Sequence, residues 1–89
     1  MGWKIELSGG AEKALSRLDT AVVRRILRFL HERLATADDP RQLGKSLTGS
    51  QLGNYWRYRV GDYRLVADVQ DKTLVVLVVR IGHRRDVYR

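Results

Sequence analysis

Three arginines near the middle of the chain have the type and spacing for chemistry on an anion. Arg57 and Arg59 are separated by one residue. Arg64 lies two positions after the dipeptide Gly61-Asp62, which is typical of a two-residue β-hairpin loop. If the strands pair directly across that loop, Arg59 lies opposite Arg64 and all three arginines share one face. Like charges opposite each other destabilise a sheet, so this face predicts an anionic partner such as a phosphate group. The alternative interpretation is a solvated sheet face whose arginines protect an edge from aggregation.

The other face of the same hairpin is apolar. The predicted pairs, outward from the loop, are Val60 with Tyr63, Arg59 with Arg64, Tyr58 with Leu65, Arg57 with Val66, Trp56 with Ala67 and Tyr55 with Asp68. Alternation then places Trp56 and Tyr58 on the apolar face, so we expect them to pack in the core rather than stack on bases.

A second set of candidate residues lies in the segment GHRRDVYR, residues 82–89. One interpretation of His83 is a general acid or base on a ribose hydroxyl or a leaving 5′-oxygen, since histidine is the residue type best suited to proton transfer near neutral pH. The other interpretation is that His83 is incidental. Tyr88 either stacks on a base or packs loosely. Because no carboxylate is placed to pair with His83, catalysis would rest mainly on arginines that stabilise charge on a phosphate.

Composition limits the classes of protein and of site. The 89 residues predict one domain, residues 1–89, and 17 Lys and Arg against 10 Asp and Glu leave a net charge of +7, which favours nucleic acid or an acidic protein as partner. The chain contains no cysteine and two distant histidines, so we expect no disulfide, no metal site and no cofactor. No secretory signal is visible, and the longest apolar run, residues 74–79, is too short to span a bilayer, so we expect a cytoplasmic protein.

Hydrophobic periodicity predicts the order β-α-α-β-β-β and an α+β fold. The expected elements are a strand at 3–7, a helix at 11–18 capped by Ser8, a helix at 20–34 capped by Asp19 or Thr20, the hairpin, and a strand at 73–81 that is apolar on both faces and therefore interior to the sheet. Residues 35–53, which include Lys45, show no sustained period and predict a long irregular connection. The helix pair should cover one face of a mostly antiparallel four-stranded sheet and leave the arginine face open.

Further arginines lie on the polar side of the second predicted helix. They are Arg24, Arg25, Arg28 and Arg33. We interpret them as an ordinary solvated helix face; a helix-turn-helix is the alternative, but no third helix supports it.

Several motifs in order resemble a known family. The segments DPRQLGKSLTG, YWRYRVGDYRLV and VLVVRIGHRRDVYR are similar to those of the RelE toxins of the RelE/ParE superfamily, the toxic halves of type II toxin–antitoxin systems. The resemblance covers nearly the whole chain and implies a microbial-ribonuclease-like fold. It also implies an mRNA interferase, a metal-independent endoribonuclease that cuts mRNA in the ribosomal A site. The implied partners are the ribosome, mRNA and an acidic RelB-like antitoxin in a hetero-oligomer.

The resemblance also implies roles for individual residues. Arg57 and Arg59 take the positions of phosphate clamp and base, Arg64 that of transition-state stabiliser, Arg84 that of general acid and Tyr88 that of a stacking or orienting group. We add Lys45 and Arg85 to the phosphate-binding residues. In the first two positions the best-known members carry lysine, and an arginine that stays protonated is a poor base. This departure raises His83 as a substitute base; the alternative is weak or lost cleavage.

Two alternative functions stay open. A ParE-like toxin shares the fold, lacks the catalytic set and poisons DNA gyrase; the matches at Arg64, Arg84 and Tyr88 argue against it. The other alternative is a basic domain that binds RNA or an antitoxin without cleaving.

Overall fold

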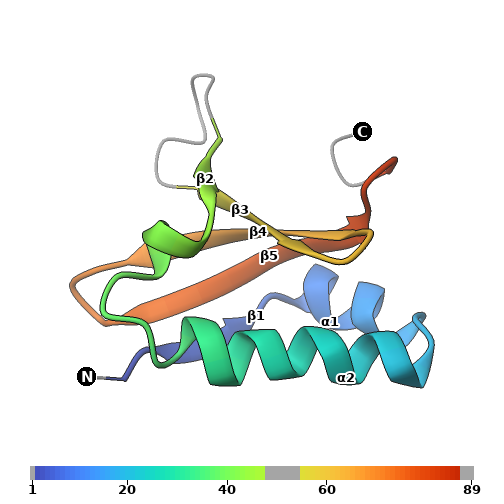
Figure 1. Cartoon of the computed structure of the whole chain (residues 1–89), viewed down its shortest axis with the longest axis horizontal. Coiled ribbons are helices and arrows are strands. Elements are labelled where there is room, and N and C mark those ends of the chain that lie inside the picture. The colour runs from blue at the N-terminus through green and yellow to red at the C-terminus, as the bar shows by residue number, and fades with distance from the viewer. Residues whose placement is uncertain (1, 48–54, 87–89) are drawn as a thin grey trace.

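A five-stranded sheet forms one layer of the fold, and both α-helices lie on the same side of it (Figure 1). The structure is a computed structural model that describes residues 2–47 and 55–86. Its elements in chain order are β1 Lys4–Leu7, α1 Gly9–Ser16, α2 Thr20–Arg28, the π-helix η1 Phe29–Leu34, the 3-10 helix η2 Pro40–Leu43, β2 Lys45–Ser46, β3 Tyr55–Val60, β4 Tyr63–Gln70 and β5 Val75–His83. The strand order is β1-β5-β4-β3-β2; β1 runs parallel to β5 and the other pairs are antiparallel.

The predicted α+β fold with a helix pair on a mostly antiparallel sheet is confirmed, but the sheet has five strands where four were expected. The additional strand, β2, and the helix η2 lie within residues 35–53, which were expected to be irregular. A two-residue strand is too short to show an alternating pattern, so periodicity could not reveal it.

Ser8 joins the first strand to the first helix. Its hydroxyl accepts a hydrogen bond from the Ala11 N–H at 3.1 Å, which confirms the predicted N-cap. Its own N–H donates to the Val78 carbonyl at 2.9 Å and its hydroxyl donates to the Val79 carbonyl at 3.3 Å. Ser8 therefore begins α1 and also fixes that helix to β5.

The second helix begins after Asp19, as predicted, although the Asp19 side chain makes no capping hydrogen bond. Ile26, Leu30 and Leu34 are fully buried at intervals of four residues along α2 and η1, which is the spacing of a single helix face.

No helix among residues 2–47 and 55–86 is long and apolar enough to cross a membrane.

The hairpin of β3 and β4 has the predicted register at all six positions from Tyr55 with Asp68 to Val60 with Tyr63. Gly61 begins its turn at a φ of 59°, a conformation that glycine adopts without steric cost. Strand β5 lies between β1 and β4, which confirms that it is interior to the sheet.

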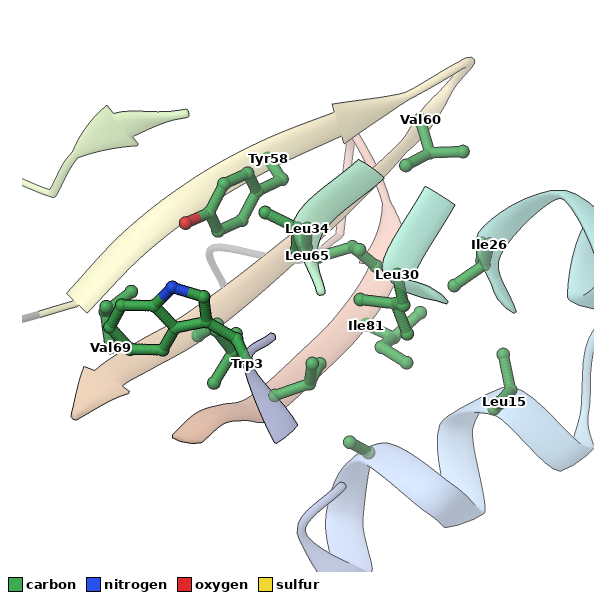
Figure 2. Close-up of a cluster of buried hydrophobic side chains, with 14 residues drawn as sticks. Trp3, Leu15, Ile26, Leu30, Leu34, Tyr58, Val60, Leu65, Val69 and Ile81 are labelled. Atoms are coloured by element: carbon green, nitrogen blue, oxygen red, sulfur yellow. The ribbon is translucent and has the colours of Figure 1, made fainter. Parts of the chain in front are cut away.

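The core lies between the helices and one face of the sheet (Figure 2). Tyr58, Val60 and Leu65 of the hairpin are buried there against Leu30 and other residues of the helix layer. Because side chains alternate along a strand, Arg57, Arg59 and Arg64 project from the opposite face, which we call the open face. Arg57 and Arg59 are exposed and Arg64 is half-buried.

Candidate functional site

A pocket with a volume of about 320 Å³ opens at the β2–β3 edge of the sheet, and we call it the sheet-edge pocket. It is lined by Leu43, Gly44, Lys45, Arg57, Tyr58, Arg59 and Arg64. Four of these seven residues are cationic, and no acidic side chain is among the described residues that line the pocket. The structure thus brings Lys45, which lies outside the hairpin and 12 positions before Arg57, to the three hairpin arginines.

The cationic side chains face one another across the strands. Lys45 pairs with Arg57 between β2 and β3, and Arg59 pairs with Arg64 between β3 and β4. Two like-charged pairs next to each other in one sheet lower its stability, and an anion between them would relieve the repulsion. Guanidinium groups offer planar forks of N–H donors that match the oxygens of a phosphate. The pocket is therefore suited to bind a phosphodiester.

Gly44 allows β2 to approach β3 closely. A Cβ atom at this position would lie 2.5 Å from the Arg57 carbonyl oxygen and 2.7 Å from Cε1 of Tyr58. Any side chain at position 44 would therefore push the neighbouring Lys45 away from Arg57. Sequence analysis did not select Gly44, because the glycine before Lys45 has no visible significance until β2 is known to pair with β3.

Tyr58 supports the pocket from beneath. Its hydroxyl donates a hydrogen bond of 2.9 Å to the Pro40 carbonyl, and its ring lies 5.9 Å from that of Phe29 between centroids. Burial raises the pKa of Tyr58 well above its ordinary value, so the phenol stays protonated and remains a donor. This hydrogen bond holds η2 against β3.

Arg41 fixes the other side of η2. Its guanidinium donates to the Asp39 carboxylate at 2.8 Å and also to Asp71 in the β4–β5 turn. The pKa of Arg41 is raised, chiefly by the hydrogen bond to Asp71. Asp39 additionally accepts from the Arg41 N–H at 3.1 Å and so caps η2. The segment that leads into Lys45 is thereby attached to two separate parts of the sheet.

Arg64 and Arg84 are both held at the Gly61-Asp62 turn. Arg64 Nη1 donates to the Gly61 and Tyr63 carbonyl oxygens, each at 3.0 Å. The Arg84 N–H donates to the Asp62 carbonyl at 2.8 Å, and Arg84 Nη1 lies 4.0 Å from the Asp62 carboxylate. Arg84 is exposed beside the turn but does not line the sheet-edge pocket.

His83 is not brought to this pocket. It pairs with Tyr63 in the register of β4 and β5, and the two rings meet edge to face at 5.7 Å between centroids. Tyr63 belongs to the face that packs toward the helices, so His83 lies on the side away from Arg57 and Arg59. Its Nδ1 accepts a hydrogen bond from the Arg85 N–H at 3.3 Å. The predicted acid–base role of His83 stays a prediction.

Two predicted site residues remain, Arg85 and Tyr88. Arg85 is exposed immediately after β5, and Tyr88 lies outside the described residues.

Comparison with known proteins gives one consistent set of similarities. The family model for the ParE toxin of the type II toxin–antitoxin system parDE matches residues 5–88. Toxin RelG of Mycobacterium tuberculosis is 27% identical over 89 residues, which cover 100% of this chain and 99% of RelG.

Two solved structures extend the comparison to three dimensions. A chain of the RelBE2 toxin–antitoxin complex of Mycobacterium tuberculosis superposes with a TM-score of 0.84 at 24% identity, covering 97% of this chain and 95% of that one, which shows a shared fold. A chain of the archaeal RelE–RelB complex of Pyrococcus horikoshii gives a TM-score of 0.76 at 28% identity, with coverage of 98% and 100%. The similarity therefore extends over essentially the full length of each protein.

Proposed function

Because the chain belongs to the ParE toxin family, within the RelE/ParE superfamily of type II toxin–antitoxin toxins, we propose that it arrests growth by cutting mRNA on the ribosome. The observation that carries the proposal is the sheet-edge pocket, where Lys45, Arg57, Arg59 and Arg64 converge. A concave group of cations can surround a single phosphate and stabilise the charge that develops on it in the transition state of cleavage.

In the proposed reaction the ribose 2′-hydroxyl attacks the adjacent phosphorus atom. The bond from phosphorus to the 5′-oxygen breaks, the 2′-hydroxyl loses its proton to solvent, and the leaving 5′-oxygen gains one. The products are a 2′,3′-cyclic phosphate and a 5′-hydroxyl. Negative charge increases on the phosphoryl oxygens during this step, and the arginines stabilise it by donating hydrogen bonds that are stronger in the transition state than in the ground state.

The proposed roles follow from protonation and position. Arginine stays protonated, so we assign Arg57, Arg59 and Arg64 to charge stabilisation, and we assign Lys45 to phosphate binding. These cations supply the positive charge that a metal ion supplies in other nucleases, and we therefore propose cleavage without a metal. We assign Arg84, beside the hairpin turn, to the leaving oxygen and Arg85 to the RNA backbone. The proposal retains Tyr88 as the stacking residue.

The proposed regulator is an acidic RelB-like antitoxin that forms a hetero-oligomer with this chain. RelE-type chains with this fold are found in complexes with RelB, and a net charge of +7 favours an acidic partner. Since ribosomes and mRNA are the targets, the proposed site of action is the cytoplasm.

Mapping of mRNA 5′ ends after induction in bacteria tests the proposal. We expect new ends within translated codons, with 5′-hydroxyl and cyclic phosphate termini. Arg64→Ala and Arg84→Ala should each abolish these ends and growth arrest while leaving the circular dichroism spectrum unchanged. Arg17→Ala removes an equal charge from an exposed position next to α1 and should retain activity. Full toxicity of both site variants would remove the proposed site.

A second candidate function is gyrase poisoning, which the match to the ParE family model favours. It predicts DNA breaks linked to gyrase and intact mRNA after induction. Growth arrest with neither mRNA ends nor DNA breaks would instead favour an RNA-binding or antitoxin-binding domain without catalysis.

A further inference from the structure

A second groove lies next to the sheet-edge pocket, and we call it the helix-side groove. It has a volume of about 430 Å³ and runs between α2, η1 and the end of β3. Arg25, Arg28, Arg33 and Arg59 contribute its cationic groups, and Phe29 and Leu43 contribute apolar surface. Three of the arginines interpreted from the sequence as a solvated helix face, Arg25, Arg28 and Arg33, therefore line this groove.

The two hollows are adjacent, because Leu43 and Arg59 line both. Among residues 2–47 and 55–86, the positions of β3 that pair with β2 are Trp56 and Arg57, so the last part of β3 forms the edge of the described sheet. Arg59 lies on this edge and is exposed. A ligand bound on the open face can thus pass around the edge at Arg59 and continue along α2 without leaving a cationic surface.

The charge balance of the groove favours an extended anion. Glu32 is the one acidic residue among the described residues that line it, and its contact with Arg28 is 3.8 Å long with both side chains about 70% exposed. Such an exposed pair binds weakly and leaves the arginine available to another anion. Arg25 lies at the far end, with Nη1 3.1 Å from the position of a Cβ on Gly61. It therefore extends the positive surface to the hairpin turn.

We propose that the helix-side groove binds the nucleotides that flank the cleaved phosphate on the same RNA strand. This inference rests on the proposed function, which places one phosphate of that strand in the sheet-edge pocket. A single strand carries a phosphate at every nucleotide, so a strand leaving the pocket at Arg59 presents successive charges to Arg25, Arg28 and Arg33. The apolar surface of Phe29 and Leu43 suits the faces of bases or ribose rings, the combination that single-stranded nucleic acid sites use.

Binding of single-stranded RNA of two lengths tests the proposal without ribosomes. Fluorescence anisotropy would compare an oligonucleotide of about three nucleotides, enough for the pocket, with one of about nine, enough for the groove as well. The groove variant replaces Arg25, Arg28 and Arg33 by Gln. The control variant replaces Lys13, Arg17 and Arg24 by Gln. It removes the same charge from exposed positions on α1, just after α1 and on α2, none of which lines either hollow.

For the longer RNA, we expect the slope of log K against log salt to fall by about 2 in the groove variant, since each lost phosphate contact contributes about 0.7 for a single strand. Affinity for the longer RNA should fall at least tenfold relative to the control variant, and affinity for the shorter RNA should fall equally in both. A second comparison uses the single variants Arg25→Gln and Arg24→Gln, which disturb the helix less than the triple variants. Arg25→Gln should lose more affinity for the longer RNA than Arg24→Gln, by a smaller factor than in the triple variants.

Three results would overturn the inference. Equal losses in the groove and control variants would mean that only overall charge matters. If the groove variant lost the same affinity for the shorter and the longer RNA, the groove would add no contact to the longer one. An unchanged RNA affinity together with weaker binding of an acidic antitoxin peptide would make the groove a protein-docking site. Failure of the proposed function is a separate result, because it would appear as intact mRNA after induction, whereas these binding measurements involve no ribosome and no cleavage.

Discussion

Replacement of Gly44 by alanine tests whether the close approach of β2 to β3 builds the sheet-edge pocket. The added Cβ would lie 2.5 Å from the Arg57 carbonyl oxygen and 2.8 Å from Cδ1 of the buried Tyr58 ring. Neither atom can move freely, since the first belongs to a paired strand and the second to the core. The backbone at Gly44 has a φ of −136°, which alanine adopts readily, so the clash is the whole cost in the folded state.

The expected magnitude follows from two opposing terms. Overpacking of a tight site costs about 1–3 kcal/mol, and the smaller conformational freedom of alanine in the unfolded chain returns about 0.4–1 kcal/mol. We therefore expect Gly44→Ala to lower the free energy of unfolding by about 1–2 kcal/mol and the Tm by about 5–15 °C for a domain of this size. Denaturant titration and thermal unfolding measure both quantities. Gly9→Ala is the control, because no atom lies within 4 Å of its Cβ position and it lies in the first turn of α1. It should leave stability unchanged or raise it.

The same variant should weaken RNA binding through Lys45. If Gly44 acts by positioning Lys45, the effect of Gly44→Ala on RNA affinity should be smaller in a Lys45→Ala background, which a double-mutant cycle measures. Wild-type stability and RNA affinity in Gly44→Ala would refute the reasoning, because β2 would then have room that the structure does not show.

Three further variants test the repulsion in the pocket, the support beneath it and the position of His83. Arg59→Gln removes the repulsion with Arg64, so we expect Tm to rise by about 1–5 °C at low salt, with no gain at 1 M salt, while RNA affinity falls; a lower Tm would contradict the like-charge argument. Tyr58→Phe removes the hydrogen bond to Pro40 and should cost roughly 1 kcal/mol near neutral pH. Because the pKa of Tyr58 is raised in the folded state, wild-type stability should also fall as pH rises above the ordinary value of 10.0, and the phenylalanine variant should lack this part of the decline. An identical alkaline decline in both proteins would exclude Tyr58 as its source. His83→Gln should retain cleavage with an unchanged pH profile, since His83 lies on the other face from the pocket; a loss that follows histidine titration would restore its predicted role.

The register of the hairpin was predictable because its determinants are local. Gly61-Asp62 specifies a two-residue turn, and strict alternation then assigns each side chain to one face. The two-residue alternation of side chains and the composition of the strands were enough to predict three features. These are the open arginine face, the apolar face with Tyr58 and the interior position of β5.

The components of the pocket outside the hairpin were less predictable. Lys45 was selected as a phosphate-binding residue, but its position opposite Arg57 depends on β2, a strand of two residues that has no period of its own. The role of Gly44 depends on a contact with a residue 14 positions later in the chain, Tyr58, and Arg41 depends on an ion pair with the distant turn at Asp71. Such contacts leave no pattern in the local sequence.

Sequence alone thus determined the charge, the fold class and the face on which the hairpin arginines lie, because turn chemistry and hydrophobic alternation are properties of neighbouring residues. Tertiary structure alone decided which other residues meet the hairpin arginines. It brought Lys45 to the arginines, held Arg84 beside the hairpin turn, turned His83 to the other face, and joined Arg25, Arg28 and Arg33 to the pocket through Arg59. These outcomes depend on long-range strand pairing and helix packing, which only the folded chain establishes.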